Sequence, residues 1–146
     1  MFIPPPLLLL IAIAFSYGVS LLFPGLQFGG SSTNLLGFLL IGIGAWLFLW
    51  AKKSLTKHKT TLRPRGKPSS LISTGPYGIS RNPIYLGFLL ISIGTALLFA
   101  NVLAFVGPII FFIFISTFVI PLEEDMLTRV FGASYKSYRQ SIRRWI

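Results

Sequence analysis

Four stretches of this chain carry no charged side chain, and they limit what it can fold into. They are residues 7–23, 35–51, 84–100 and 102–120. A helix of about 17 residues is roughly 25 Å long, which approaches the ~30 Å hydrocarbon core of a bilayer when interfacial residues flank it. More than half of the chain, 53%, is hydrophobic. The sequence therefore predicts an all-α integral membrane four-helix bundle, formed by residues 1–146 as a single domain.

The third and fourth stretches are separated only by Asn101. One helix over both would overshoot the bilayer, so we expect a tight hairpin that turns at this residue. Eight of the thirteen Lys and Arg residues lie between Lys52 and Arg81, and the other five lie in the C-terminal tail. Cytoplasmic segments of membrane proteins carry the excess of Lys and Arg. The pattern predicts a multi-pass protein with a cytoplasmic loop at 52–82, a cytoplasmic tail at 122–146 and both termini in the cytoplasm.

Cysteine, histidine and net charge narrow the chemistry of the chain. It has no Cys and a single His, His58, which leaves little material for a metal site or a thiol nucleophile. The net charge of +10 would suggest nucleic acid in a soluble protein, but here the basic residues flank membrane stretches. We expect them to attract anionic membrane lipids, and we predict neither a nucleic acid nor a metal as partner. No basic residue precedes the first stretch, so a retained span is expected rather than a cleaved signal peptide.

A nonapeptide occurs twice in the membrane stretches at a spacing of 50 residues. LGFLLIGIG at 36–44 and LGFLLISIG at 86–94 share eight of nine residues. In each copy two glycines lie seven residues apart, and therefore on one face of a helix. Small residues on such a face let two membrane helices approach closely. We expect these glycines to serve helix packing, and we do not take the two copies as a duplication.

The segment after the fourth stretch is predicted to form cytoplasmic helices. Pro121 cannot continue a helix without a kink, so we expect a new helix to begin near Leu122, with the three consecutive acids in its first turn. Gly132 indicates a break, after which large side chains recur at helical spacing. These side chains are Tyr135, Tyr138, Ile142 and Trp145. The basic residues on the other faces are Lys136, Arg139, Arg143 and Arg144. The pattern predicts a C-terminal interfacial helix on the cytoplasmic leaflet.

The stretch GPYGISRNPIYLG, residues 75–87, leads into the third membrane helix. Part of it has a structural interpretation, because Asn82 suits a helix N-cap and Pro83 suits the first helical position. That interpretation leaves the rare acids unexplained. Since the hairpin begins at Pro83 and ends just before the acids, residues 82–85 and 123–124 should meet at one membrane depth. We expect a polar pocket there, suited to a zwitterionic or cationic nucleotide-like ligand.

These motifs resemble those of a family of membrane enzymes. TGPYGISRNPIYLG at 74–87, a two-span hairpin and EEDMLTRVFGASYKSYRQSIRRWI at 123–146 occur in the order found in the isoprenylcysteine carboxyl methyltransferases and their bacterial phospholipid methyltransferase-like relatives. With a lead-in rich in Thr and Pro, the resemblance covers residues 60–146. Two departures are visible. Asn82 replaces a frequent histidine, and Leu122 replaces an arginine often found before the paired glutamates, so the substrate-orienting role of that position is open.

The resemblance implies methyl transfer from S-adenosyl-L-methionine at the cytoplasmic face. The cofactor-binding positions that it implies are Leu71, Ile72, Tyr77, Asn82, Pro83, Tyr85 and Glu123. The first two of these would contribute backbone contacts. Arg81 and Glu124 match further positions of the motif and are expected to support catalysis. The implied acceptor is a lipophilic small molecule or a lipidated substrate, and the resemblance does not distinguish a carboxylate from an amine or a thiol.

Two other functions stay open from the sequence. Membrane sterol reductases share a related helical core and a proline–tyrosine motif, but they use a nicotinamide cofactor. A non-catalytic four-helix module that binds lipid or a partner protein is the second alternative. The paired glutamates favour methyl transfer, and binding of S-adenosylhomocysteine without binding of NADPH would separate it from the reductase. The sequence leaves the oligomeric state and the need for a general base undecided.

Overall fold

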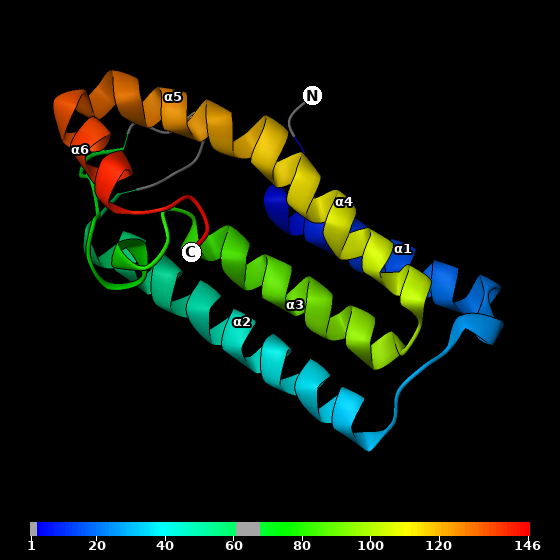
Figure 1. Ribbon diagram of the computed structural model, residues 1–146. Helices are drawn as coiled ribbons and strands as arrows, with labels where there is room; N and C mark the ends of the chain where they lie inside the picture. Colours follow the sequence, from blue (N-terminus) through cyan, green and yellow to red (C-terminus); the bar gives the residue numbers. More distant parts are fainter. Residues whose placement is uncertain (1–2, 61–67) are drawn as a thin grey trace.

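The computed structural model describes residues 3–60 and 68–146, and these residues form helices joined by short turns (Figure 1). The α-helices are α1 (Pro5–Leu22), α2 (Ser31–Lys57), α3 (Pro83–Phe99), α4 (Val106–Phe114), α5 (Ile120–Phe131) and α6 (Ala133–Ser141). Three 3-10 turns, η1 (Pro24–Leu26), η2 (Gly75–Gly78) and η3 (Val102–Phe105), and a π-helical turn, η4 (Ile115–Val119), connect them. The described residues contain no β-strand, so the predicted all-α class is confirmed.

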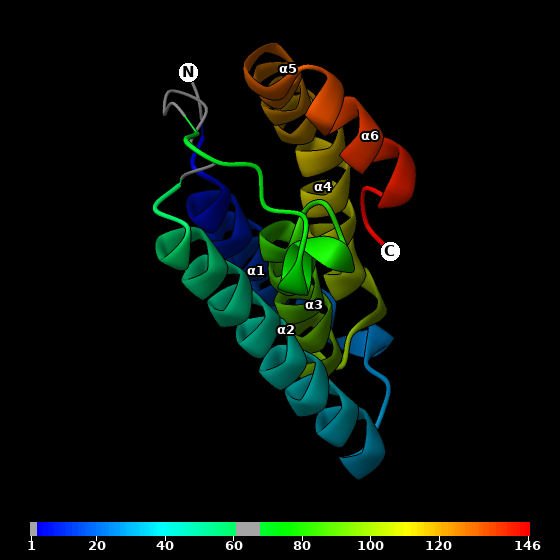
Figure 2. The same ribbon diagram turned by 90° about the vertical axis from the view of Figure 1, so that its left-hand side faces the viewer.

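A helix covers each of the four uncharged stretches. α1, α2 and the stretch Val102–Phe131 are long and apolar enough to cross a membrane, and α3 is apolar but shorter, with 17 residues. α1, α2, α3 and α4 run side by side (Figures 1 and 2). α5 extends beyond them at one end, where α6 folds back (Figure 1). Residues 61–67 of the predicted cytoplasmic loop, with three of its basic residues, lie outside the described residues.

The two copies of the nonapeptide pack against each other, antiparallel, in the interface between α2 and α3. A Cβ atom added at Gly44 would lie 2.5 Å from the carbonyl oxygen of Gly87, and one at Gly87 would lie 2.6 Å from that of Gly44. Seven residues along, Gly37 and Gly94 meet in the same way, with corresponding distances of 2.9 and 2.7 Å. No side chain fits between the backbones at these points. The predicted packing role of the four glycines is confirmed.

Asn101 forms the turn between α3 and the final hairpin arm. Ala100 ends α3 in the left-handed conformation, with φ of 50°. The fully buried Asn101 side chain donates from Nδ2 to the carbonyl of Phe23, at 2.7 Å, and its Oδ1 accepts from the backbone N–H of Leu103, at 2.9 Å. The predicted hairpin at this residue is confirmed, and its side chain also ties the turn to the end of α1.

We expect Asn101→Ala to destabilise the fold, because the partly buried carbonyl of Phe23 and N–H of Leu103 lose the buried amide that pairs with both. An unsatisfied buried group costs about 1–3 kcal/mol, and a loss of about 2 kcal/mol should lower the melting temperature in detergent by roughly 4–8 °C. Asn34→Ala, at an exposed position of α2, is the control. Equal melting temperatures for the two variants would show that the turn does not depend on this side chain.

The helix at the end of the hairpin passes Pro121 without a break, which corrects the predicted start near Leu122. The π-helical turn η4 precedes the proline, and the N–H of Ile120 donates to the carbonyl of Ile115, five residues earlier. A π-turn shifts the hydrogen-bond register, so that the missing N–H of the proline falls where the helix tolerates it. α4, η4 and α5 therefore follow one another without interruption, and the helix changes direction between α4 and α5 (Figure 1). Because α5 has no free start, the expected attraction of the acids to a helix dipole has no basis here.

The C-terminal helix is shorter than predicted. Gly132 separates α5 from α6 as expected, with φ of 53°. However, α6 ends at Ser141, and Ile142 is extended. Ile142 and Trp145 therefore do not continue the helical face of the two tyrosines. Tyr135 and Tyr138 are buried in the protein. The chain beyond α6 runs back toward the start of α3, where the C-terminus lies (Figure 1).

Candidate active site

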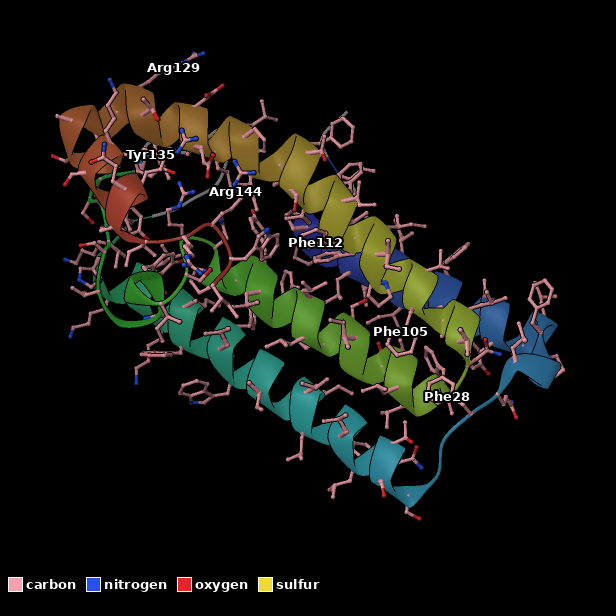
Figure 3. All side chains as sticks on the ribbon, viewed as in Figure 1. Phe28, Phe105, Phe112, Arg129, Tyr135 and Arg144 are labelled. Carbon is pink, nitrogen blue, oxygen red and sulfur yellow. The ribbon has the colours of Figure 1, made fainter. Side chains whose placement is uncertain are left out.

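A pocket lies where α5 and α6 meet the loop that leads into α3. Its empty space, counted together with the open solvent at its mouth, is about 460 Å³. Its lining residues are Leu55, Thr60, Ser70, Leu71, Ile72, Tyr77, Arg81, Asn82, Glu123, Glu124, Leu127, Tyr135 and Tyr138. Figure 3 shows Tyr135 and Arg144 at this end of the bundle, beside α5 and α6. The predicted pocket between the two ends of the hairpin is therefore present.

The structure brings most of the sequence-predicted site residues together. Those that line the pocket are Leu71, Ile72, Tyr77, Arg81, Asn82, Glu123 and Glu124. Pro83 and Tyr85 are buried and are not among the lining residues. Pro83 occupies the first turn of α3, and its fixed φ suits that position. This position explains the proline structurally, and its role toward a cofactor stays a prediction.

Tyr85 and Glu123 join the two ends of the hairpin. The Tyr85 hydroxyl donates to Oε1 of Glu123 at 2.5 Å, a distance typical of a hydroxyl bound to a carboxylate. The residues are 8% and 4% exposed. Within the described residues, this is the one hydrogen bond of the Glu123 side chain. Tyr85 therefore fixes the carboxyl group from behind, while Glu123 itself lines the pocket.

Glu124 lies between two arginines. Its Oε1 is 3.0 Å from Nη1 of Arg81, and its Oε2 is 2.7 Å from Nη2 of Arg144. The side chains of Arg81 and Glu124 are each 8% exposed. A buried carboxylate needs such partners to offset the loss of hydration. The sequence pattern assigned Arg144 to anionic lipid and missed this contact, although one signal was available: a buried acid in a basic chain requires a nearby cation.

Asn82 stands at the N-cap position of α3, but its side chain does not cap the helix. Its carbonyl accepts the first helical bond, from the N–H of Leu86, at 3.0 Å. The side-chain Nδ2 instead donates to the backbone carbonyl of Arg144, at 3.0 Å. The expected capping role of the side chain is therefore wrong. Ser80 supplies a local contact in its place, since its Oγ accepts from the backbone N–H of Asn82 at 3.1 Å.

Three tyrosine hydroxyls surround the pocket. Tyr138 donates to the backbone carbonyl of Tyr77 at 2.7 Å, and Tyr135 accepts from Nη1 of Arg81 at 3.4 Å. Burial raises the pKa of each phenol, and the charge of Glu123 raises the pKa of Tyr77 further. The phenols therefore stay protonated at neutral pH. The helical spacing placed Tyr135 and Tyr138 on one face but did not assign them to the pocket.

Two buried donors beside the pocket have no partner among the described residues. They are the hydroxyl of Tyr77 and Nε of Arg81. Buried polar groups in proteins are nearly always hydrogen-bonded, so the pair indicates that a polar ligand or water completes the site. Glu123 adds a carboxylate on the same lining. A ligand that carries both a carboxylate and a positive charge fits this set of groups.

Comparison with known proteins places the chain in a family. Residues 32–134 match the phospholipid methyltransferase family. An uncharacterised protein of Haemophilus influenzae is 43% identical over 63 residues, which are 43% of this chain and all of that protein. Protein-S-isoprenylcysteine O-methyltransferase of Schizosaccharomyces pombe is 30% identical over 113 residues, and protein-S-isoprenylcysteine O-methyltransferase B of Arabidopsis thaliana is 33% identical over 127 residues.

The alignments with the two methyltransferases cover 75% and 82% of this chain, but only 47% and 61% of those proteins. The chain thus spans about half of the length of the named relatives. The family match extends from the start of α2 to the start of α6, and it includes the whole first motif and residues 123–134 of the second. The chain belongs to the phospholipid methyltransferase family.

Proposed function

We propose that this protein transfers a methyl group from S-adenosyl-L-methionine to a lipophilic or membrane-associated acceptor. The observation that carries the proposal is the pocket itself. It combines a buried carboxylate with two donors that have no partner among the described residues, the hydroxyl of Tyr77 and Nε of Arg81. The amino-acid portion of the cofactor carries a carboxylate and an ammonium group, and its sulfur is a cation. The chemistry of the lining matches both signs of charge.

The residues that would hold the cofactor come from three elements. Leu71 and Ile72 line the pocket from the loop and would offer backbone groups, while Tyr77 would donate its hydroxyl. Asn82 lines the pocket at the start of α3, next to Pro83. Glu123, held by Tyr85, would accept from a positively charged part of the cofactor. Arg81 and Glu124 would support this arrangement through their ion pair.

Methyl transfer from a sulfonium requires little acid–base catalysis by the protein. When bound, S-adenosyl-L-methionine supplies a methyl group that its sulfonium already activates. The protein must align the acceptor with that methyl group and keep water out, and such alignment is a large part of catalysis in bond-forming reactions. The buried lining, with Tyr77, Tyr135 and Glu123 each at most 4% exposed, suits this task. A carboxylate or thiolate acceptor requires no general base, whereas an amine acceptor must lose a proton.

The surroundings of the pocket favour a lipophilic acceptor at the cytoplasmic face. The helices that lead to the pocket expose many large apolar side chains, and three of them are suited to cross a membrane. Basic residues gather at the same end, with Lys52, Lys53 and Lys57 in the last turns of α2. By the positive-inside rule this end and both termini would lie in the cytoplasm, close to anionic lipid. The acceptor would approach within the bilayer while the water-soluble cofactor enters from the cytoplasm.

Calorimetry on the full chain in detergent tests the proposal. Wild-type protein should bind S-adenosylhomocysteine, the product of the cofactor, and should not bind NADPH. Binding of NADPH alone would favour a reductase, and binding of neither would favour a non-catalytic module. A second step identifies the acceptor. Membranes that contain the protein are incubated with methyl-labelled cofactor, and the label is measured in the lipid, protein and volatile fractions.

A further inference from the structure

The last five residues of the chain, 142–146, form a strap across the motif that begins α3. We call this segment the C-terminal strap. Its backbone accepts three hydrogen bonds from that motif. The N–H of Arg81 donates to the carbonyl of Arg143 at 3.0 Å, and Ser80 Oγ and Asn82 Nδ2 both donate to the carbonyl of Arg144, at 3.2 and 3.0 Å. In Figure 1 this red segment ends beside the start of α3.

The Arg144 side chain connects the strap to α5. Its Nε and Nη2 donate to the two oxygens of Glu124, at 3.2 and 2.7 Å. Such a two-point contact between a guanidinium and a carboxylate fixes the orientation of both groups. One of those oxygens, Oε1, also contacts Nη1 of Arg81 at 3.0 Å. Arg144 therefore sets the position of Arg81 through the carboxylate that they share.

The contact between Arg144 and Glu124 affects the pocket through Arg81, which lines it. Its Nη1 is held by Glu124 and by the hydroxyl of Tyr135, so the guanidinium has a fixed orientation and its Nε stays unpartnered among the described residues. Next to Arg144, the ring of Trp145 lies 5.1 Å from that of Phe112 and anchors the strap to α4. The strap thus joins three helices around the site.

We propose that Arg144 is a positioning residue for the cofactor pocket. The inference rests on the proposed function and adds to it a residue that lies beyond the family match, which ends at residue 134. The Arg144 side chain holds Glu124 at two points and thereby keeps Arg81 in the geometry that receives the cofactor, while the Arg144 backbone carbonyl accepts from Asn82. The interaction is specific to the side chain, because a lysine would keep the positive charge but lose the two-point contact.

Arg143 provides a matched control. It precedes Arg144 in the same strap, has an exposed side chain, and contacts the motif through its backbone carbonyl. Arg143→Gln removes the same charge from the same segment and keeps that hydrogen bond. A general effect of tail charge, on the membrane or on the cofactor, would therefore appear equally in Arg143→Gln and Arg144→Gln.

The test measures binding of S-adenosylhomocysteine by calorimetry to the full chain and its variants in detergent. We expect Arg144→Gln to weaken binding by at least about tenfold, because the buried Glu124 carboxylate loses a charged partner that binds it at two points. Arg144→Lys should fall between Arg144→Gln and the wild type, and Arg143→Gln should bind within about twofold of the wild type. In a Glu124→Gln background, Arg144→Gln should add less than about twofold, since the two residues act as one unit.

The outcomes separate this inference from the proposed function. If wild-type protein binds no S-adenosylhomocysteine, the proposed function fails and the positioning role fails with it. If the wild type binds and Arg144→Gln behaves like Arg143→Gln, only the positioning role is overturned. Should Arg144→Gln not fold, Arg144→Lys decides. Weaker binding, together with faster hydrogen exchange at the Arg81 amide, supports the role, and wild-type values of both overturn it.

Discussion

Glu123→Gln is expected to weaken binding of S-adenosyl-L-methionine by roughly 100-fold, the energetic equivalent of about 3 kcal/mol. Glutamine has the same shape, and its carbonyl oxygen can still accept from the Tyr85 hydroxyl, so the fold should be retained. The substitution removes the negative charge from the pocket lining. Removing one partner of a buried charge pair typically costs about 3–5 kcal/mol. Calorimetry with the purified variant measures the loss.

Comparison of two ligands refines this prediction. S-adenosylhomocysteine lacks the sulfonium charge but keeps the ammonium group. If Glu123 faces the sulfonium, the variant should lose more affinity for S-adenosyl-L-methionine than for S-adenosylhomocysteine. If Glu123 faces the ammonium group, both losses should be equal. Asp125→Asn, two residues along α5 and exposed, is the control, and an equal loss in that variant would contradict a specific role for Glu123.

The helices and the hairpin could be predicted because they depend on local properties of the sequence. Apolar stretches of membrane length and a polar residue between two of them are visible in one dimension. The two ends of the hairpin then had to meet, since two antiparallel arms of similar length return to the same depth. The hydrogen bond from Tyr85 to Glu123 is the result of that geometry. The roles of these residues in binding a cofactor stay predictions.

The sequence did not reveal how the C-terminal tail packs, because that depends on contacts between distant segments. Tyr135, Tyr138, Ile142 and Trp145 have helical spacing, but the helix ends at Ser141. Beyond it, the backbone of Arg144 receives donors from Ser80 and Asn82, which compete with a continued helix. For the same reason the side chain of Asn82 does not cap α3. At both helix ends, hydrogen bonds between distant segments outweigh the local conformational preference of the sequence.

The π-helical turn η4 could not be predicted from the sequence either. The residues ISTFV carry no signature that separates them from an ordinary α-helix. Only Pro121 signals an irregularity, and it predicts a kink, which differs from a change of hydrogen-bond register. The register change matters for the site because each residue inserted into a helix rotates all later residues by about 100°. The change of register at η4 and the continuation of the helix into α5 together direct Glu123 and Glu124 toward the pocket.

Gly44→Ala is expected to destabilise the protein by about 3 kcal/mol, near the upper end of the usual range for overpacking. The new Cβ atom would lie 2.5 Å from the carbonyl oxygen of Gly87 and 3.0 Å from atoms of Ile91. Because the nearest atom belongs to the backbone, no change of side-chain rotamer relieves the overlap. α2 and α3, which share the largest helix–helix interface of the described residues, must separate along their length. Thermal unfolding in detergent should show a melting temperature lowered by roughly 6–12 °C.

Gly42 allows the same substitution to be made on the same helix without the overlap. A Cβ at this exposed position meets nothing within 4 Å, and alanine favours a helix over glycine by up to about 1 kcal/mol. Gly42→Ala should therefore leave the melting temperature unchanged or raise it. Both variants make the same chemical change, two residues apart on one helix. The difference between their melting temperatures therefore results from the backbone contact at Gly44. If Gly44→Ala were as stable as Gly42→Ala, the close approach of α2 and α3 at the repeated glycines would be wrong.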